Sequence, residues 1–580
     1  MSSHVRLLPL VLLLLACARG TSVTRLEPVP GKRTEGRTGM VAASHPDAAA
    51  AGAAILRQGG NAVDAAVATA FALSVVDPSQ TGLGGGGAAV VWLRGPRTAD
   101  VVDFMAASGA DSLWSVAAST PSGQRHGRAA AVPGTVAGLL HLLERHGSLS
   151  RAAVMAPAIR LARDGFVVSP LLSRTITSSL EKLRVDSLAL ARFAPGGTPL
   201  QPGDRLVQPE LAATLARIAG EGATAFYAGD VARRLAHRVR ETGGLITEAD
   251  LRDFRVVRHR PVCARFAGHT LLSAAPTLSG MSVAEALGIF EHALPEDSAG
   301  RTLAESPRAA VVLAEAMRLA DADRLRWRGD PGVMPVPARG IASAAFAAER
   351  AALVGRGADS LPAGDPWQEE SAAPPAACAA LDPYPAAPRS TSADAPGPDT
   401  DDGTSNTSHL SVVDARRNAV SMTFTVGVLF GSGVYTDGFF LNSAGTNFDR
   451  RTAGPNRRNN STMAPTILLE GNDVRLVVGA AGSQYIPPAV VQTVVHVARY
   501  GRDVGDALAA PRLSPGRGRE LEIEPGWSPA VYTALRAAGY TLRNRIADMQ
   551  FGGVHAVQVR RDGRLIGAAD PRRDGVAVGF

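Results

Sequence analysis

Thr407 lies where the sequence changes character, and its side chain has a route to becoming a nucleophile. Residues 364–406 before it are rich in Pro, Ala, Ser, Asp and Thr, whereas Leu410 and Val412 after it begin the alternation of a strand. A hydroxyl near pH 7 needs an adjacent base. A threonine at a chain terminus carries one, because its α-amine has a pKa of ~7.7–8.0. We therefore hypothesise that the chain cuts itself before Thr407 and then uses Thr407 for catalysis.

Two other patterns look like functional sites but have ordinary explanations. His141, Glu144 and His146 share one predicted helix, yet their spacing matches no zinc-binding helix and the two histidines diverge around it. The glycine run at 82–87 leads into a strand and is not followed by Gly-Lys-Ser/Thr, unlike a phosphate-binding loop. We expect no metal and no cofactor. We interpret the glycine run as close backbone packing or a substrate-facing turn.

The composition excludes some classes of protein. Hydrophobic residues make up 46% and charged residues 19% of the 580 residues, which is ordinary for a globular protein. The net charge of +7 comes from scattered arginines, with no basic block interleaved with aromatic residues, so nucleic-acid binding is not expected. Cys263 and Cys378 are the only cysteines beyond Cys17, and we expect neither a disulfide framework nor a cysteine metal site.

The N-terminal segment predicts export. Arg6 precedes an apolar run at 7–16 that is too short to cross a bilayer but typical of a signal peptide. The run ends in Leu-Leu-Ala before Cys17, which resembles a bacterial lipobox; the alternative is a plain signal peptide cut near Ala18 or Gly20. We assign residues 1–17 to the signal and 18–37 to a linker. We expect a bacterial protein of the periplasm or cell envelope, touching the membrane only through a lipid on Cys17.

The remaining pattern predicts a layered α+β protein. Helical stretches separated by Gly/Pro turns dominate the chain before Thr407, for example at 62–76 and 135–146. We interpret the Pro/Ala/Ser-rich residues 364–406 as disordered. After Thr407, paired alternating runs with short turns between them predict hairpins, and apolar helices follow. The predicted hairpins join 410–412 to 420–424, 466–470 to 474–478, and 555–559 to 565–568; the predicted helices cover 488–500 and 528–538.

Many segments, in order along the chain, resemble the gamma-glutamyltranspeptidase family of N-terminal nucleophile hydrolases. The similarity covers nearly all of the chain after the signal. It implies a four-layer αββα sandwich and a precursor that cleaves itself into two subunits that stay together. The matching segments are 39–46 (GMVAASHP), 59–66 (GGNAVDAA), 132–138 (VPGTVAG), 243–251 (GGLITEADL), 320–324 (ADADR), 407–414 (TSHLSVVD), 463–467 (MAPTI) and 568–572 (AADPR).

The resemblance also implies roles for individual residues. It places the cleavage between Asn406 and Thr407, giving a large subunit of residues 38–406 and a small catalytic subunit of 407–580. Thr425 matches a second threonine expected to hydrogen-bond the nucleophile. The remaining matches are Gly482 and Ser483, at the family's Gly-Gly oxyanion turn, and Ser461 and Thr462, at its substrate-contacting Ser-Ser pair.

The chain departs from the family where a glutamyl group would be recognised. The family's carboxylate-binding arginine falls at Met105, an asparagine falls at Gly427, and the acidic residue that holds the α-amino group falls at Asn447. A glutamyl head carries both a carboxylate and an ammonium, and a buried site needs opposite charges to bind them. Met105 supplies no charge, and Asn447 accepts a hydrogen bond without neutralising an ammonium.

Three functions remain open from the sequence. Thr407 hydrolyses γ-glutamyl compounds such as glutathione, or passes the acyl group to an amino acid acceptor. Alternatively, the same machinery accepts another acyl amide, as in cephalosporin-acylase-like relatives. The third is a lipid-anchored binding protein that has lost the chemistry.

Overall fold

Two seven-stranded sheets form the middle of the molecule. The computed structural model describes residues 31–110, 127–295, 302–356, 362–389, 405–448, 455–549 and 551–580. Within these residues the first sheet, which we call the nucleophile sheet, has the strand order β21-β2-β10-β11-β3-β4-β7, and the second, the facing sheet, has the order β1-β20-β19-β15-β14-β9-β8. All the pairings that the two sheets contain are antiparallel.

The strands of these sheets come from both ends of the chain. The nucleophile sheet consists of β2 (Met40–Ala43), β3 (Gly86–Leu93), β4 (Thr98–Asp103), β7 (Val257–His259), β10 (Ser405–Val413), β11 (Ala419–Val428) and β21 (Val576–Gly579). The facing sheet consists of β1 (Arg33–Gly36), β8 (Val262–Phe266), β9 (His269–Ser273), β14 (Thr466–Glu470), β15 (Asp473–Ala481), β19 (Gly553–Val559) and β20 (Leu565–Ala569).

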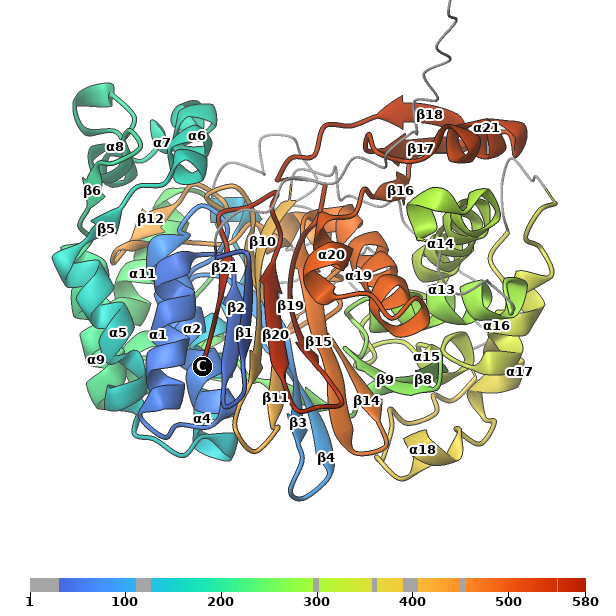
Figure 1. Cartoon of the computed structure of the whole chain (residues 1–580). Helices are drawn as coiled ribbons and strands as arrows, with labels where there is room; N and C mark the ends of the chain where they lie inside the picture. The colour runs from blue at the N-terminus through green and yellow to red at the C-terminus, as the bar shows by residue number, and fades with distance from the viewer. Residues whose placement is uncertain are drawn as a thin grey trace, which may run out of the picture.

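Helices cover the outer face of each sheet, which gives the four layers helix, sheet, sheet, helix (Figure 1). The predicted αββα sandwich is therefore confirmed. Beside the nucleophile sheet lie α1 (Pro46–Arg57), α2 (Ala62–Val76), α4 (Thr135–His146), α5 (Arg151–Asp164), α9 (Pro209–Glu221) and α11 (Gly229–Glu241). Beside the facing sheet lie α13 (Gly280–Ala293), α14 (Pro307–Trp327), α16 (Ala344–Ala351), α19 (Ile486–Val494) and α20 (Val504–Ala509).

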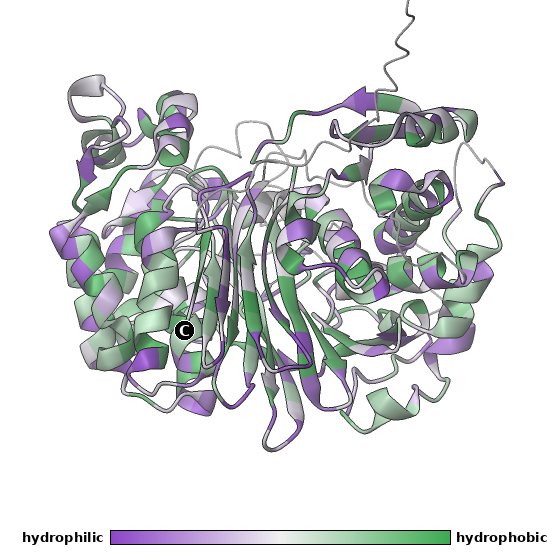
Figure 2. Cartoon of the chain, in the orientation of Figure 1, coloured by the Kyte–Doolittle hydropathy of each residue, from purple (hydrophilic) through white to green (hydrophobic). Residues whose placement is uncertain are grey.

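Shorter elements surround this sandwich. Figure 2 shows hydrophobic residues concentrated on the central strands, with hydrophilic residues gathered on outer helix faces and loops. The peripheral helices are α6 (Pro170–Ser178), α7 (Leu180–Leu183), α8 (Ser187–Phe193), α10 (Thr224–Tyr227), α12 (Glu248–Asp253), α15 (Ala338–Ile341), α17 (Trp367–Glu370), α18 (Ala376–Ala379) and α21 (Pro529–Ala537). The peripheral strands are β5 (Phe166–Val167), β6 (Arg205–Leu206), β12 (Tyr435–Thr436), β13 (Phe439–Phe440), β16 (Leu513–Pro515), β17 (Glu520–Ile523) and β18 (Thr541–Asn544).

Helix α2 is buried along its whole length and leads to the edge of the sandwich that carries Thr407. The Asn61 side chain caps its start, and the Asp64 carboxylate accepts from the Asn61 N–H, which completes a capping box. Every residue of α2 is buried, as its apolar composition on all sides predicts. The helix ends at Asp77, whose loop reaches the first residues of β10 through Ser408.

The β10–β11 hairpin places Thr407 near the start of a central strand. Leu410 pairs with Met422 and Val412 with Val420, as the predicted hairpin requires. Leu410 and Val412 pack in the helix-side core, whereas the Ser411 hydroxyl donates across the sandwich to the backbone oxygen of His555. The pairs β14–β15 and β19–β20 confirm the other two predicted hairpins, and α19 and α21 confirm the predicted helices.

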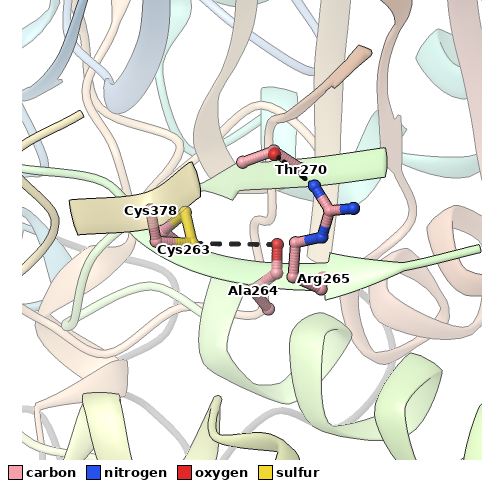
Figure 3. Close-up of a disulfide and its surroundings, with 5 residues drawn as sticks. All are labelled: Cys263, Ala264, Arg265, Thr270 and Cys378. Carbon is pink, nitrogen blue, oxygen red and sulfur yellow. Dashed lines mark hydrogen bonds between the residues drawn. A yellow bond between two sulfur atoms is a disulfide. The ribbon is translucent and has the colours of Figure 1, made fainter. Parts of the chain in front are cut away.

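The proline-rich segment corrects two sequence predictions. Residues 364–389 are folded, with α17, α18 and buried side chains at Trp367 and Tyr384, so disorder is wrong for this part of 364–406. Cys378 forms a disulfide with Cys263 of β8, with an S–S distance of 2.01 Å, so the expectation of no disulfide is also wrong (Figure 3). Aromatic burial and this cross-link supply the ordering that composition alone did not reveal. The predicted disorder of residues 390–404 lies outside the described residues.

The N-terminal predictions are only partly accessible. The predicted linker at 18–37 is wrong for Arg33–Gly36, because these residues form β1 and pair with β20. The predicted signal at 1–17 and its Cys17 lie outside the described residues. Of the helices that the structure describes, none is both long and apolar enough to cross a membrane.

The disulfide should contribute measurably to stability. It joins residues 115 apart in sequence, and closing a long loop contributes about 2–4 kcal/mol. We expect the double variant Cys263→Ala/Cys378→Ala to unfold several degrees below the wild type in a thermal scan. Reductant should lower the wild-type midpoint similarly and leave the double variant unchanged. Two titratable thiols in the native, unreduced protein would contradict this prediction.

Candidate active site

Thr407 is buried at an irregular point of the β10–β11 pairing. Its side chain and backbone are together only 3% exposed. Asn406 pairs with Gly427 and Ser408 with Phe424, so the register shifts around Thr407. Such a bulge re-aims a side chain relative to a regular strand. The proposed scissile bond, Asn406–Thr407, is thus held inside a central strand of the sandwich.

Thr425 contacts the carbonyl of the proposed scissile bond. Its hydroxyl donates a short hydrogen bond to the backbone oxygen of Asn406 and accepts one from the N–H of Gly427 at 2.7 Å. Because the Gly427 N–H occupies a lone pair of this hydroxyl, the hydroxyl proton is directed to the carbonyl. Thr425 therefore stands where negative charge would develop if Thr407 attacked the carbonyl carbon of Asn406.

Gly427 has no room for a side chain. Its φ is +91°, and a Cβ there would lie 2.2 Å from the Ser443 hydroxyl. The asparagine that the resembling family carries at this position could not be accommodated without moving Ser443 and the backbone. This departure from the family is thus built into the local backbone.

The predicted oxyanion turn lies where the facing sheet ends, near the start of β10. Gly482 has φ +126° and Ser483 φ +56°, and Ser483 begins a helical stretch formed by the 3-10 turn Ser483–Tyr485, α19 and the π-helical turn Val495–Arg499. The first N–H groups of a helix have no acceptor within it and favour anions. The strand β10 contacts this turn. The oxyanion role of Gly482 and Ser483 stays a prediction, and Ser483 occupies a backbone conformation that favours glycine.

Ser461 and Thr462 lie beside this turn but make structural bonds. The Thr462 hydroxyl donates to the backbone oxygen of Ser483 at 2.9 Å, so it braces the oxyanion turn. The Ser461 hydroxyl accepts from the N–H of Met463 at 3.2 Å and keeps its own proton to donate. The Ser461 backbone is held by Thr277 and Ser279. Of the pair, Ser461 is the better placed to contact a substrate.

The remaining predicted recognition positions supply no charge. Met105 is 2% exposed and packs in the core between the sheets. The backbone of Asn447 lies in the 3-10 turn Ala444–Asn447, and its side chain lies outside the described residues. Arg458 was not predicted from the sequence; its guanidinium donates to the backbone oxygen of Met105 and lies 4.6 Å from the Phe254 ring centre. The basic pair that precedes Ser461 was the available signal.

A buried polar cluster, also missed, surrounds the first residues of β10. The Ser408 hydroxyl donates to Asp77 Oδ2 at 2.6 Å, and Gln80 Nε2 donates to Asp77 Oδ1 at 2.9 Å. Arg573 Nη1 donates to Gln80 Oε1 and, at 3.2 Å, to the backbone oxygen of Thr407. Burial raises the pKa of Asp77 to about 7. No spacing in the sequence predicts this cluster, because its members lie on three distant segments.

The glycine run and the histidine pattern behave as structural features. A Cβ on Gly85 would lie 2.3 Å from the backbone oxygen of Thr425, so the run serves close backbone packing. His146 Nε2 bonds Asp100 Oδ2 at 3.0 Å and so joins α4 to β4. Among the described residues, no group of three His, Cys, Asp or Glu side chains is placed to hold a metal ion.

Comparisons with known proteins agree on one family and include relatives with two different names. A family model described as gamma-glutamyltranspeptidase matches residues 48–580. The chain is 34% identical to the Acylase ACY 1 proenzyme of Pseudomonas sp. (strain SE83), over 94% of each chain. It is 33% identical to the glutathione hydrolase proenzyme of Bacillus subtilis (strain 168), over 94% of this chain and 92% of that one. A cephalosporin acylase structure from Bacillus halodurans superposes with a TM-score of 0.81 at 25% identity, covering 96% and 98% of the two chains.

The bond from Thr425 to Asn406 predicts a defect in self-cleavage. Thr425→Val keeps the shape but removes the hydroxyl. One oxyanion donor is worth ~2.7–4 kcal/mol, so cleavage should slow by about 10²–10³-fold. Thr425→Ser, which keeps the hydroxyl, is the matched control and should cleave much faster than the valine variant. Denaturing gels over time after synthesis measure both rates. Wild-type cleavage by Thr425→Val would contradict the assigned role.

Proposed function

Because the chain belongs to the gamma-glutamyltranspeptidase family, we propose that it is a precursor that cuts itself between Asn406 and Thr407. As a member of this family it is an enzyme, an N-terminal nucleophile hydrolase or acyltransferase acting on amides. The observation that carries the proposal is the hydrogen bond from the Thr425 hydroxyl to the backbone oxygen of Asn406, one residue before a buried hydroxyl. That arrangement suits attack on this carbonyl.

The first reaction makes the catalyst. Thr407 Oγ1 attacks the carbonyl carbon of Asn406, and the Thr425 hydroxyl stabilises the negative oxygen. The C–N bond then breaks, its nitrogen takes the hydroxyl proton, and an ester joins Asn406 to Thr407 Oγ1. Water hydrolyses this ester, leaving a carboxylate on Asn406 and a free α-amine on Thr407. That amine is the base that the hydroxyl lacked.

The second reaction uses the new end of the chain. The α-amine of Thr407 takes the proton from Oγ1, which attacks the carbonyl of an acyl donor. We assign stabilisation of the resulting oxyanion to the N–H groups of Gly482 and Ser483, and their position at the start of a helical stretch supports this assignment. The leaving amine departs with the proton. Water or an amino acid acceptor then attacks the acyl-enzyme, giving hydrolysis or transfer.

We propose γ-glutamyl amides, including glutathione, as the first substrate class, on the basis of the family and its glutathione hydrolase members. A second class, non-glutamyl acyl amides, is favoured by the apolar Met105 at the carboxylate-binding position. The acylases among the relatives support this alternative. Arg458 does not restore the missing charge, because the residue is 7% exposed and its guanidinium donates to backbone oxygens.

We also propose that the protein is exported. The apolar run at 7–16 followed by Cys17 supports a lipid-anchored protein of the periplasm or cell envelope. The Cys263–Cys378 disulfide supports the same location, because such bonds persist in oxidising compartments. Mass spectrometry of the N-terminal peptide from cell envelopes tests it. An unmodified peptide containing Met1 and Cys17, from cytoplasmic protein, would exclude export.

The nucleophile assignment predicts an all-or-none effect. Thr407→Ala should remain uncut between residue 406 and residue 407 and should be inactive, because it lacks the attacking oxygen. The wild type should yield a fragment that begins at Thr407, identified by intact-mass spectrometry. Thr407→Ser retains a hydroxyl and an α-amine after cleavage, and it should cleave and turn over. Cleavage at this bond in Thr407→Ala would exclude the mechanism.

The acyl specificity can be decided with two matched donors. γ-Glutamyl and glutaryl anilides share a leaving group and a distal carboxylate, and differ only in the α-ammonium. A site built for glutamate prefers the ammonium form by about 10-fold or more, since an unpaired charge disfavours binding by at least ~1.4 kcal/mol. We expect measurable kcat/KM for the glutamyl donor. A rate at background for it, with turnover of the glutaryl donor, would establish the acylase alternative.

A further inference from the structure

Cleavage before Thr407 creates a positioning problem. The residue that carries both nucleophile and base becomes a chain end, and chain ends fray unless they are held. The bond through which Asn406 restrains it is lost. Contacts on the carbonyl side of Thr407 and on Ser408 remain, and both lead to the buried cluster of Asp77, Gln80 and Arg573.

Arg573 is the member of this cluster that touches Thr407 itself. Nη1 donates to the Thr407 backbone oxygen at 3.2 Å, and Nη2 donates to the backbone oxygen of Met549 at 2.6 Å. The side chain lies on Gly553 of β19, where a Cβ would come within 2.2 Å of Arg573 Cδ. Gly553 thus leaves space for the side chain of Arg573, a residue that is 4% exposed.

Gln80 ties this arginine to the other catalytic strand. Its side-chain oxygen accepts from Arg573, and its amide nitrogen donates to Asp77, which accepts from the Ser408 hydroxyl. Its backbone oxygen accepts from the N–H of Val426, the residue after Thr425, at 3.0 Å. The loop that follows α2 therefore connects the start of β10 to the strand that carries Thr425.

We propose that Arg573 is a positioning residue for the mature enzyme, which holds the carbonyl end of Thr407 after cleavage and keeps the Thr407 α-amine in its neutral, basic form. This inference rests on the proposed role of Thr407 as nucleophile. The first effect is geometric: fixing the carbonyl oxygen fixes the backbone rotation that orients Oγ1 and the amine. The second effect is electrostatic, because a positive charge disfavours an ammonium on the same residue.

Other charged groups act on Arg573 and Asp77. Asp77, Asp570, Asp574 and Asp548 are the carboxylates that act on Arg573 or Asp77, and Arg512 is a further cation. Burial raises the pKa of Asp77 to about 7, which weakens the opposing charge of this carboxylate.

Two buried histidines pack between the sheets on β10 and β19. Burial lowers the pKa of His555 to about 3 and that of His409 well below its usual value, so both are neutral. Arg573 thus brings a positive charge into hydrogen-bond contact with Thr407.

Two substitutions separate geometry from charge. Arg573→Gln removes the charge, whereas Arg573→Lys keeps it but loses the bidentate geometry. The experiment uses the processed two-subunit protein and the better of the two anilide donors. For Arg573→Gln we expect the acidic limb of kcat/KM to move up by about one pH unit. We expect kcat to fall by on the order of 10- to 100-fold with a smaller change in KM.

For Arg573→Lys we expect a lower kcat but an acidic limb at the wild-type position. Arg561→Gln, which removes a largely exposed arginine (side chain 80% exposed), is the matched control and should behave as wild type. A wild-type limb and kcat in Arg573→Gln would overturn the inference. If that variant does not fold, Arg573→Lys decides: a shifted limb or an unchanged kcat in a folded, processed lysine variant overturns it.

Failure of this inference is distinguishable from failure of the proposed function. If the wild type is not cut before Thr407, or Thr407→Ala turns over the donor, the nucleophile assignment itself is wrong. If the wild type is cut, Thr407→Ala is inactive, and the Arg573 variants match wild type, only the role of Arg573 is wrong.

Discussion

In the proposed mechanism the nucleophile and its base belong to one residue, Thr407, and the other assigned roles in the site depend on that constraint. The hydroxyl and amine of Thr407 can cooperate only if the peptide bond before it is first broken in place. The residues on either side of Thr407 are held by hydrogen bonds. The Thr425 hydroxyl donates to the backbone oxygen of Asn406, and Asp77 accepts from the Ser408 hydroxyl. The surroundings can therefore stay fixed while the covalent chain changes.

The register of β10 converts this constraint into a fold requirement. A shift by one residue would turn every side chain of the strand to the opposite face. The polar residues between the sheets oppose such a shift, because His409 bonds the hydroxyls of Thr423 at 2.8 Å and Ser411 at 3.1 Å. Gly479 of the facing sheet lies against the His409 ring, with no space for a side chain. Thr407 lies two residues before His409 on the same strand.

Features that depend on neighbouring residues could be predicted from the sequence, whereas contacts between residues far apart in the chain could not. The hairpin at Asp414–Asn418 and the capped helix α2 follow from local patterns, and both form as expected. The Cys263–Cys378 bond and the Arg573 contact join residues more than 100 positions apart, which no periodicity encodes. Disorder at 364–389 was wrong because composition ignores what a few buried aromatic residues and one cross-link contribute.

Catalysis relies mainly on backbone groups, whereas substrate recognition relies on side chains. This explains why the predicted catalytic positions match the family and the recognition positions depart from it. The predicted oxyanion turn would act through backbone N–H groups, so Ser483 can replace a glycine and still supply its donor. Thr425 acts on a backbone oxygen. Recognition of a glutamyl group instead requires side-chain charge, which Met105, at the position matched to the family's arginine, does not supply. A fold of this kind can therefore change its acyl group without losing its nucleophile, because the two depend on different atoms.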